Sequence, residues 1–118
     1  MSNSNSHSLS LAELPSTVQR YLELREGADA ASAADLFAED AVVSDEGRTY
    51  TGRDQIRAWI DDTNASYEYT TEFLGARETE GMTAVSFRLT GNFPGGVVDL
   101  EYQFRLDGEG LIAHLYFA

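Results

Sequence analysis

Hydrophobic residues recur at helical spacing near the start of the chain. Five apolar or aromatic residues stand at i, i+3, i+7, i+10 and i+11, which is one stripe of a helix. They are Leu11, Leu14, Val18, Tyr21 and Leu22. Ser10 and Glu13 are spaced as a capping box at the start of this helix, and Gly27 is placed to end it.

The next elements are shorter. Asp29 is the expected cap of a second helix, whose apolar side runs from Ala30 to Phe37. Residues 41–44 read as a short strand, and residues 48–52 as a turn with an extended segment. A third helix follows, with an apolar face that consists of Ile56, Trp59 and Ile60.

From Tyr67 onward, apolar and polar residues alternate with the period of two that is typical of strands. Strands are predicted over residues 67–74, 84–90, 100–106 and 111–117. Residues 107–110 form a hairpin turn, and residues 92–96 a longer loop. Helices followed by a meander of strands predict an α+β fold, with the helices packed on one face of an antiparallel sheet. Strong curvature of that sheet would leave a pocket beneath the helices.

Length and composition bound this picture. The chain of 118 residues, with 42% hydrophobic content, is large enough for one domain with a real core and too small for two. Residues 1–10, mostly Ser and Asn, are expected to be a disordered leader, and residues 11–118 a single domain. The sequence has no apolar run of about eighteen residues, so no membrane span is expected.

Charge and missing residue types narrow the chemistry. The net charge of −12 argues against nucleic acid and anionic membrane surfaces as partners, and the acidity itself is explained by solubility. The chain has no Cys, and all eight basic residues are Arg. These absences exclude thiol chemistry and a Schiff-base lysine. The absence of Cys, and so of disulfides, favours a cytoplasmic protein. Of the two His, only His114 lies outside the leader, and since zinc sites draw on several His or Cys ligands, no metal is expected. The sequence has no Gly-rich phosphate loop after a strand, so no nucleotide cofactor, and no other cofactor, is expected.

One pair of residues suggests chemistry. Asp45 follows the apolar run of residues 41–43 and lies 24 positions after Tyr21. Tyr21 belongs to the buried stripe of the first helix. A carboxylate and a phenol that share an apolar pocket can move a proton and stabilise an enolate. Each also has a plain structural explanation, since Tyr21 suits a core and Asp45 suits a turn.

At this point the chain resembles the nuclear transport factor 2-like superfamily, on the branch of the ketosteroid isomerases and SnoaL-like polyketide cyclases. The resemblance covers residues 12–118. It is carried by Val18-Gln19-Arg20-Tyr21, by residues 35–43 and 50–56, and by the hairpin at 104–110. It implies a cystatin-like cone, in which helices and a strongly curved sheet enclose an apolar pocket. It also implies a homodimer through the outer sheet face, with side chains such as Glu101, Gln103 and Arg105.

The resemblance assigns roles to residues. In ketosteroid isomerases a first-helix tyrosine donates to a dienolate oxygen, an aspartate after the first short strand carries the proton, and a second, protonated aspartate also donates. Tyr21 and Asp45 match the first two positions. Tyr102 stands near the third, whereas Asp99 lies three residues earlier and is not expected to replace the acid.

The remaining candidates come from the strands and the third helix. His114 alternates with Ile112 and Tyr116 and is expected to share their face. If Ile112 faces the pocket, His114 is an alternative acid or base; otherwise it is a structural histidine. Candidate pocket walls are Trp59, Tyr69, Phe87 and Tyr116. The prediction is a cofactor-free isomerase or cyclase that moves a proton on an apolar, steroid- or polyketide-like carbonyl compound. The alternative is a non-catalytic module that binds a hydrophobic small molecule or acts through dimerisation.

Overall fold

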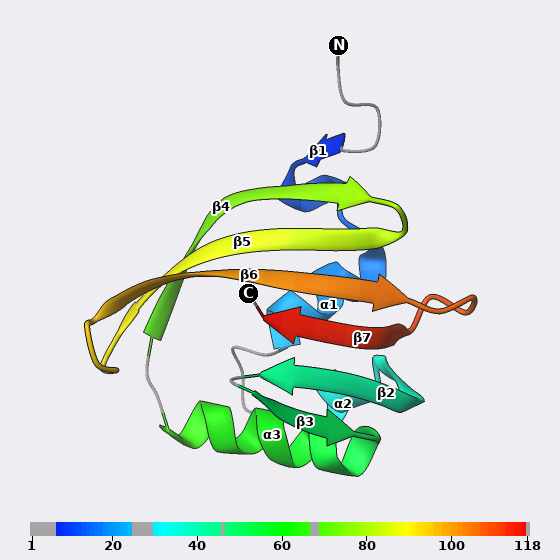
Figure 1. The fold of residues 1–118 in the computed structure, drawn as a ribbon, viewed down its shortest axis with the longest axis horizontal. Coiled ribbons are helices and arrows are strands. Elements are labelled where there is room, and N and C mark those ends of the chain that lie inside the picture. Colours follow the sequence, from blue (N-terminus) through cyan, green and yellow to red (C-terminus); the bar gives the residue numbers. More distant parts are fainter. Residues whose placement is uncertain (1–6, 25–29, 46, 67–68, 118) are drawn as a thin grey trace.

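The computed structural model of this protein describes residues 7–24, 30–45, 47–66 and 69–117. Seven strands form one sheet in the order β1-β4-β5-β6-β7-β2-β3 (Figure 1). The strands are β1 (His7–Leu9), β2 (Phe37–Asp45), β3 (Arg48–Thr51), β4 (Tyr69–Thr79), β5 (Met82–Gly91), β6 (Val97–Leu106) and β7 (Ile112–Phe117). The helical elements are the 3-10 turn η1 (Leu11–Glu13) and the helices α1 (Ser16–Leu24), α2 (Ala30–Ala34) and α3 (Arg53–Ser66).

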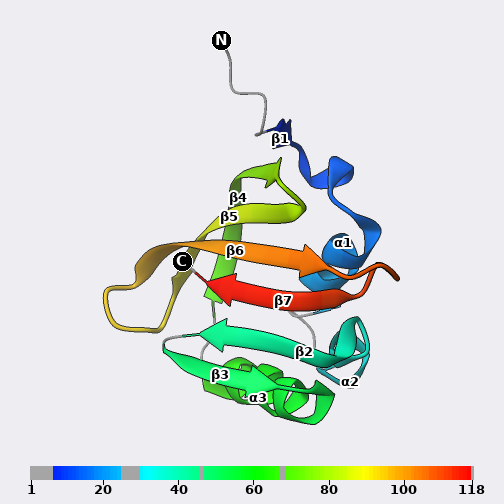
Figure 2. The ribbon, with the colours of Figure 1, turned by 45° about the vertical axis from the view of Figure 1, so that its right-hand side comes forward.

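The helices lie on one side of the sheet, which bends around them (Figures 1 and 2). A register shift between Phe73 and Gly75 interrupts the pairing of β4 with β5. Such bulges bend a strand and increase its twist, and this one lies in the curved part of the sheet. The predicted α+β fold, with helices packed on a curved sheet, is confirmed.

The sheet is mixed and not purely antiparallel as expected. β7 runs antiparallel to β6 but parallel to β2. The two parallel strands are separated in sequence by β3, α3 and three long strands, so no short turn dictates their relative direction. Alternation along a strand says which face is buried, and it carries no information about the direction of a distant neighbour.

The core lies between the concave sheet face and the helices. Phe104 on β6, Leu115 on β7 and Val43 on β2 are fully buried and stand in adjacent register positions. Val18 on α1 and Ile56 on α3 are also fully buried. The apolar stripe predicted for the third helix therefore faces this core, and so do the residues of the first stripe that lie on α1. None of the helices in the described part of the chain is long and apolar enough to cross a membrane.

The first predicted helix is divided in two. Leu14 takes an extended conformation, with ψ of 153°, between η1 and α1. The residue before a proline is driven away from helical ψ, and Pro15 follows Leu14. The expected bond from the Ser10 amide to Glu13 Oε1 forms at 2.8 Å, but it caps the short η1. Leu14 nevertheless remains buried, but η1 itself has no buried residue, and Leu11, expected on the buried stripe, is 44% exposed.

Two other expectations for the start of the chain need correction. Residues 7–9, which were expected to belong to a disordered leader, form β1 and pair with β4. Phe37, expected on the second helix, begins β2 opposite Ile112 and is fully buried. Its carbonyl accepts a 2.8 Å hydrogen bond from Arg53 Nε, which fixes the start of α3 against β2. The predicted roles of Gly27 and Asp29 fall outside the described residues.

Candidate functional site

Asp45 is the last residue of β2, where it stands opposite Arg48 of β3. It lies two positions after the buried Val43, so its half-buried side chain belongs to the concave face. Trp59 of α3 donates a 3.0 Å hydrogen bond from Nε1 to Asp45 Oδ2. The carboxylate is therefore held by an indole from the helix that packs beneath β2 and β3.

The Trp59 indole belongs to a continuous group of aromatic side chains. Its ring centroid lies 6.1 Å from that of Tyr50 and 5.7 Å from that of Phe117. Phe117 in turn meets Tyr102 edge to face at 4.6 Å. The candidate base thus stands beside an aromatic layer that leads from α3 to the middle of the sheet.

Tyr21 and Tyr102 are both almost fully buried, with 2% and 3% of their surface exposed. Each contacts Phe104, Tyr21 at 5.7 Å and Tyr102 at 6.4 Å between ring centroids. Tyr21 also packs edge to face against Phe37 at 5.6 Å. The two predicted oxyanion donors therefore approach one phenylalanine, Tyr21 from the helix layer and Tyr102 from the sheet.

Asp45 and Tyr21 stand at the two ends of this layer. The contacts run in the order Tyr21, Phe104, Tyr102, Phe117, Trp59, Asp45. Of the two tyrosines, Tyr102 is nearer to the carboxylate along this series. The catalytic roles of these residues stay predictions.

The candidate wall residues Phe87 and Tyr69 lie on the same concave face. Phe87 is 5% exposed and meets Tyr102 at 5.5 Å and Phe73 at 6.0 Å. Tyr69, the first residue of β4, is half-buried and packs against the core.

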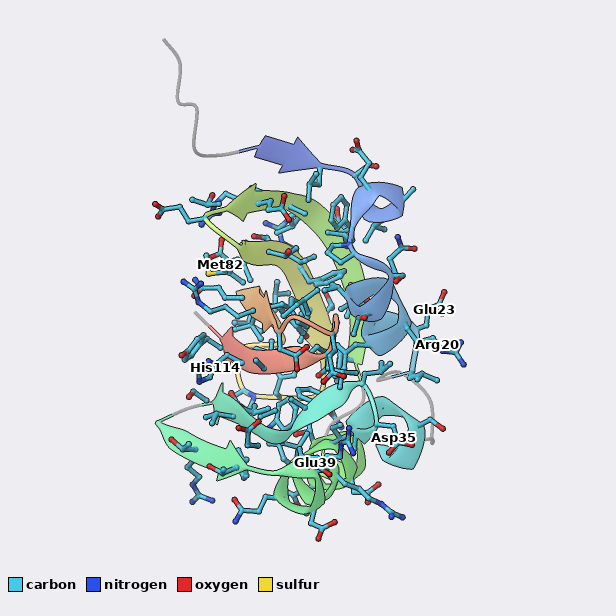
Figure 3. All side chains as sticks on the ribbon, turned by 90° about the vertical axis from the view of Figure 1, so that its right-hand side faces the viewer. Arg20, Glu23, Asp35, Glu39, Met82 and His114 are labelled. Carbon is cyan, nitrogen blue, oxygen red and sulfur yellow. The ribbon has the colours of Figure 1, made fainter. Side chains whose placement is uncertain are left out.

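His114 and Tyr116 lie on the opposite face of the sheet. A register shift in β7 pairs Leu106 with Ile112 but Arg105 with His114. Ile112 therefore faces the core, where it is fully buried, while His114 shares the outer face with Arg105. His114 lies on the side of the sheet away from the helices (Figure 3). Tyr116 follows it on that face, and the centroids of the two stacked rings are 5.2 Å apart. The expectation that His114 shares a face with Ile112 is wrong because the bulge shifts the alternation, and the same shift removes Tyr116 from the predicted pocket wall.

Ion pairs dominate the neighbouring part of the outer face. Arg88 holds Asp99 through two hydrogen bonds, of 2.9 and 3.1 Å, and the hydrogen bond from this guanidinium lowers the pKa of the Asp99 carboxyl. Hydrogen bonds from Gln103 at 2.7 Å and from Arg77 at 2.8 Å lower the pKa of Glu101. Asp99 is thus an ion-pair partner on the outer face and is not placed near the aromatic layer, which agrees with the sequence-based expectation.

Hollows lie on both sides of the sheet in the described part of the chain. One, of about 470 Å³, lies on the concave side between η1, α1 and the strands β4 and β5, and Phe87 forms part of its floor. Another, of about 550 Å³, lies on the outer side of β4, β5 and β6, beside the Arg77–Glu101 pair. Among the described residues, no group of three or more His, Asp or Glu is arranged to hold a metal ion.

Residues 18–114 match the SnoaL-like domain. The chain belongs to the SnoaL-like family. This confirms the resemblance to the nuclear transport factor 2-like superfamily. A search of curated proteins found no match.

Solved structures agree with this assignment. A candidate polyketide cyclase from Sinorhizobium meliloti is 30% identical, with a TM-score of 0.86 over 93% of this chain and 100% of that chain. A protein with a ketosteroid isomerase-like fold from Catenulispora acidiphila, solved in complex with trimethylamine, is 23% identical, with a TM-score of 0.76 over 88% of this chain and 85% of its own. A protein from Sphaerobacter thermophilus is 25% identical, with a TM-score of 0.73 over 86% of this chain and 91% of that chain.

Sequence reasoning missed two members of the aromatic layer. Phe117 was not selected because the alternation was extended through β7 without the bulge, which assigned Tyr116 to the inside in its place. Tyr50 was read as part of a turn, but it pairs with Val43 and contacts Trp59. The signal for Phe117 was the buried register of Phe104 and Leu115, which becomes visible only once β6 and β7 are paired.

Proposed function

We propose that this protein is a cofactor-free enzyme that moves a proton on an apolar, steroid- or polyketide-like carbonyl compound, as an isomerase or cyclase. The single observation that carries the proposal is the hydrogen bond from Trp59 to Asp45 at the edge of the aromatic layer. A carboxyl group held in this way keeps its orientation beside apolar walls.

In the proposed reaction Asp45 acts as the base. One carboxylate oxygen accepts the Trp59 hydrogen bond, and the other removes a proton from the carbon next to the substrate carbonyl. The electron pair of the broken C–H bond moves to the carbonyl oxygen and forms an enolate. Protonated Asp45 then returns the proton to a different carbon, so that no cofactor or external oxidant is needed.

Tyr102 and Tyr21 are the proposed hydrogen-bond donors to the enolate oxygen. Both are nearly water-free and approach the same ring, that of Phe104. Donors in such an environment stabilise developing negative charge more strongly than water does. The family membership supports this arrangement, and the substrate itself stays open within the class of apolar carbonyl compounds.

A matched ligand pair tests the proposal. At mildly alkaline pH, 4-nitrophenol is an anion that resembles the enolate, and 4-nitrotoluene has nearly the same shape without the oxygen. Tyr102→Phe should weaken binding of the anion by about 3 kcal/mol, and Tyr21→Phe should weaken it by a similar amount. Binding of nitrotoluene should change little in either variant. Asp45→Asn should instead tighten binding of the anion. In the proposed intermediate the negative charge lies next to a neutral, protonated Asp45, and the neutral Asn side chain reproduces that state.

Tyr116→Phe is the matched control, since this tyrosine lies on the outer face. It should leave both affinities unchanged. If Tyr102→Phe and Tyr21→Phe lower the affinities for the two ligands equally, the site does not stabilise an enolate. The same conclusion follows if Asp45→Asn leaves the affinity for the anion unchanged. The protein would then fit the alternative of a non-catalytic binding module.

A further inference from the structure

The concave hollow of about 470 Å³ lies apart from the aromatic layer that carries Asp45. Phe87 separates the two regions, since it lines the hollow and its ring meets that of Tyr102 at 5.5 Å. We infer that this hollow is a second binding site, for an apolar ring compound that carries a hydroxyl group and no negative charge. The inference does not depend on the proposed proton transfer.

Size and walls of the hollow fit a small ring system. Ligand sites typically have volumes of about 300–1,000 Å³ and mostly apolar walls. Most of the lining side chains are apolar; they are Leu11, Ala12, Leu14, Leu22, Phe73 and Phe87. The two phenylalanines meet edge to face at 6.0 Å and form an aromatic floor, while the leucines come from η1, α1 and the residue between them.

Gln19 contributes a hydrogen-bond acceptor to the hollow, whose other polar lining side chains are Thr71 and Glu23. Its Nε2 donates to the carbonyl of Ala12 at 3.2 Å and to that of Leu14 at 2.8 Å. Both partners are acceptors, so the amide orientation is fixed, and both amide hydrogens are used. The part of the Gln19 side chain that remains is its carbonyl oxygen, which can only accept. A ligand that pairs with it must bring a donor, such as a hydroxyl group.

The charges around the hollow disfavour an anion. Glu23 lines the rim with its side chain 68% exposed, and it pairs with Arg20 at 3.5 Å on the side of α1 away from the sheet (Figure 3). Among the described residues that line the hollow, none is basic. The net charge of −12 repels anions further. A carboxylate or phosphate would therefore enter without a counter-charge, whereas a neutral alcohol meets no such penalty.

The same Gln19 side chain holds one wall in place. Ala12 belongs to η1 and Leu14 follows it, so the two hydrogen bonds tie this segment to α1. The exposed Leu11, at 44% of its surface, sits on the same segment and lines the hollow. Ligand burial at this site would thus add apolar cover to a leucine that is otherwise in water.

Titration of the whole protein with 2-naphthol and with 2-naphthoate, followed by NMR, tests the inference. The alcohol should bind at least about tenfold more tightly than the carboxylate of the same ring. Intermolecular NOEs should connect 2-naphthol to the methyl groups of Leu14 and Leu22 in the wild-type protein. This readout needs no variant and therefore does not depend on how well a substituted chain folds.

Thr71→Phe is designed to fill the hollow, because Thr71 lines it from β4 and is only half-buried. It should lower the affinity for 2-naphthol at least about tenfold. Thr49→Phe makes the same change at an exposed position of β3 and should leave the affinity unchanged. Absence of binding, equal affinity for the two ligands, or NOEs to Trp59 and Phe117 in place of the leucines would each overturn the inference.

Discussion

The two faces of the sheet use the same strands for opposite purposes. On β6, Tyr102 and Phe104 face the helices and are buried among aromatic rings, while Glu101 and Gln103 face outward and join an ion-pair network. On the concave face a half-buried carboxyl group, that of Asp45, stands beside aromatic walls, and this is the environment on which the proposed proton transfer relies. The proposed function therefore relies on residues of the concave face, and the bulge in β7 places His114 and Tyr116 on the other face.

The largest expected difference between the faces is in stability. Phe104 is fully buried and contacts both Tyr21 and Tyr102, so Phe104→Ala should lower the free energy of unfolding by about 3–5 kcal/mol. Arg105→Ala, one residue later and exposed on the outer face, should change it by less than about 0.5 kcal/mol. Urea denaturation of the two variants measures both values. Similar losses would show that the outer face is also part of a packed core.

The second expected effect concerns the bond that holds Asp45. A double-mutant cycle of Trp59→Phe and Asp45→Ala should give a coupling energy of about 1.5 kcal/mol. Either substitution alone already removes the hydrogen bond between the indole and the partly buried carboxyl group, so the double variant does not lose it a second time. The same cycle with Asp61, an exposed carboxylate on α3, should give additive effects. A coupling near zero for Asp45 would mean that Trp59 does not hold the carboxylate in solution, and the proposed base would lose its support.

Much of this arrangement follows from local patterns in the sequence. Alternation along 100–106 placed Tyr102 and Phe104 on one face, and helical spacing placed Tyr21 on the buried side of α1. What failed were features that depend on how the strands pair. The parallel pairing of β7 with β2 joins strands far apart in sequence, whereas the bulge beside Ala113 belongs to the hairpin of β6 and β7 and interrupts the alternation within it. The bulge decides on which face His114, Tyr116 and Phe117 lie.

The break at Pro15 teaches a different lesson. The rule that a residue before proline avoids helical ψ was available from the sequence, but the continuous apolar stripe outweighed it. The break shapes the concave hollow, since the short segment before Pro15 supplies Leu11 and Ala12 to its wall.

The homodimer expected from the sequence, in which two copies of the chain would pair through the outer face of the sheet, stays a prediction.

The smallest expected effect lies in that outer network and appears only as a dependence on pH. Hydrogen bonds from Gln103 and then Arg77 lower the pKa of Glu101 in the folded protein, against the opposing effect of its partial burial. A lowered folded pKa means that the group stabilises the fold above its ordinary, unfolded pKa and loses that contribution as the pH falls through the unfolded value and then the folded one. Glu101→Gln should therefore reduce stability at neutral pH by less than about 1 kcal/mol, because solvent screens such pairs. The difference between variant and wild type should shrink in acid, whereas Glu109→Gln, in the exposed turn before β7, should show no such trend. Urea midpoints across the acidic range decide the point, and a difference that grows as the pH falls would reverse the assigned sign.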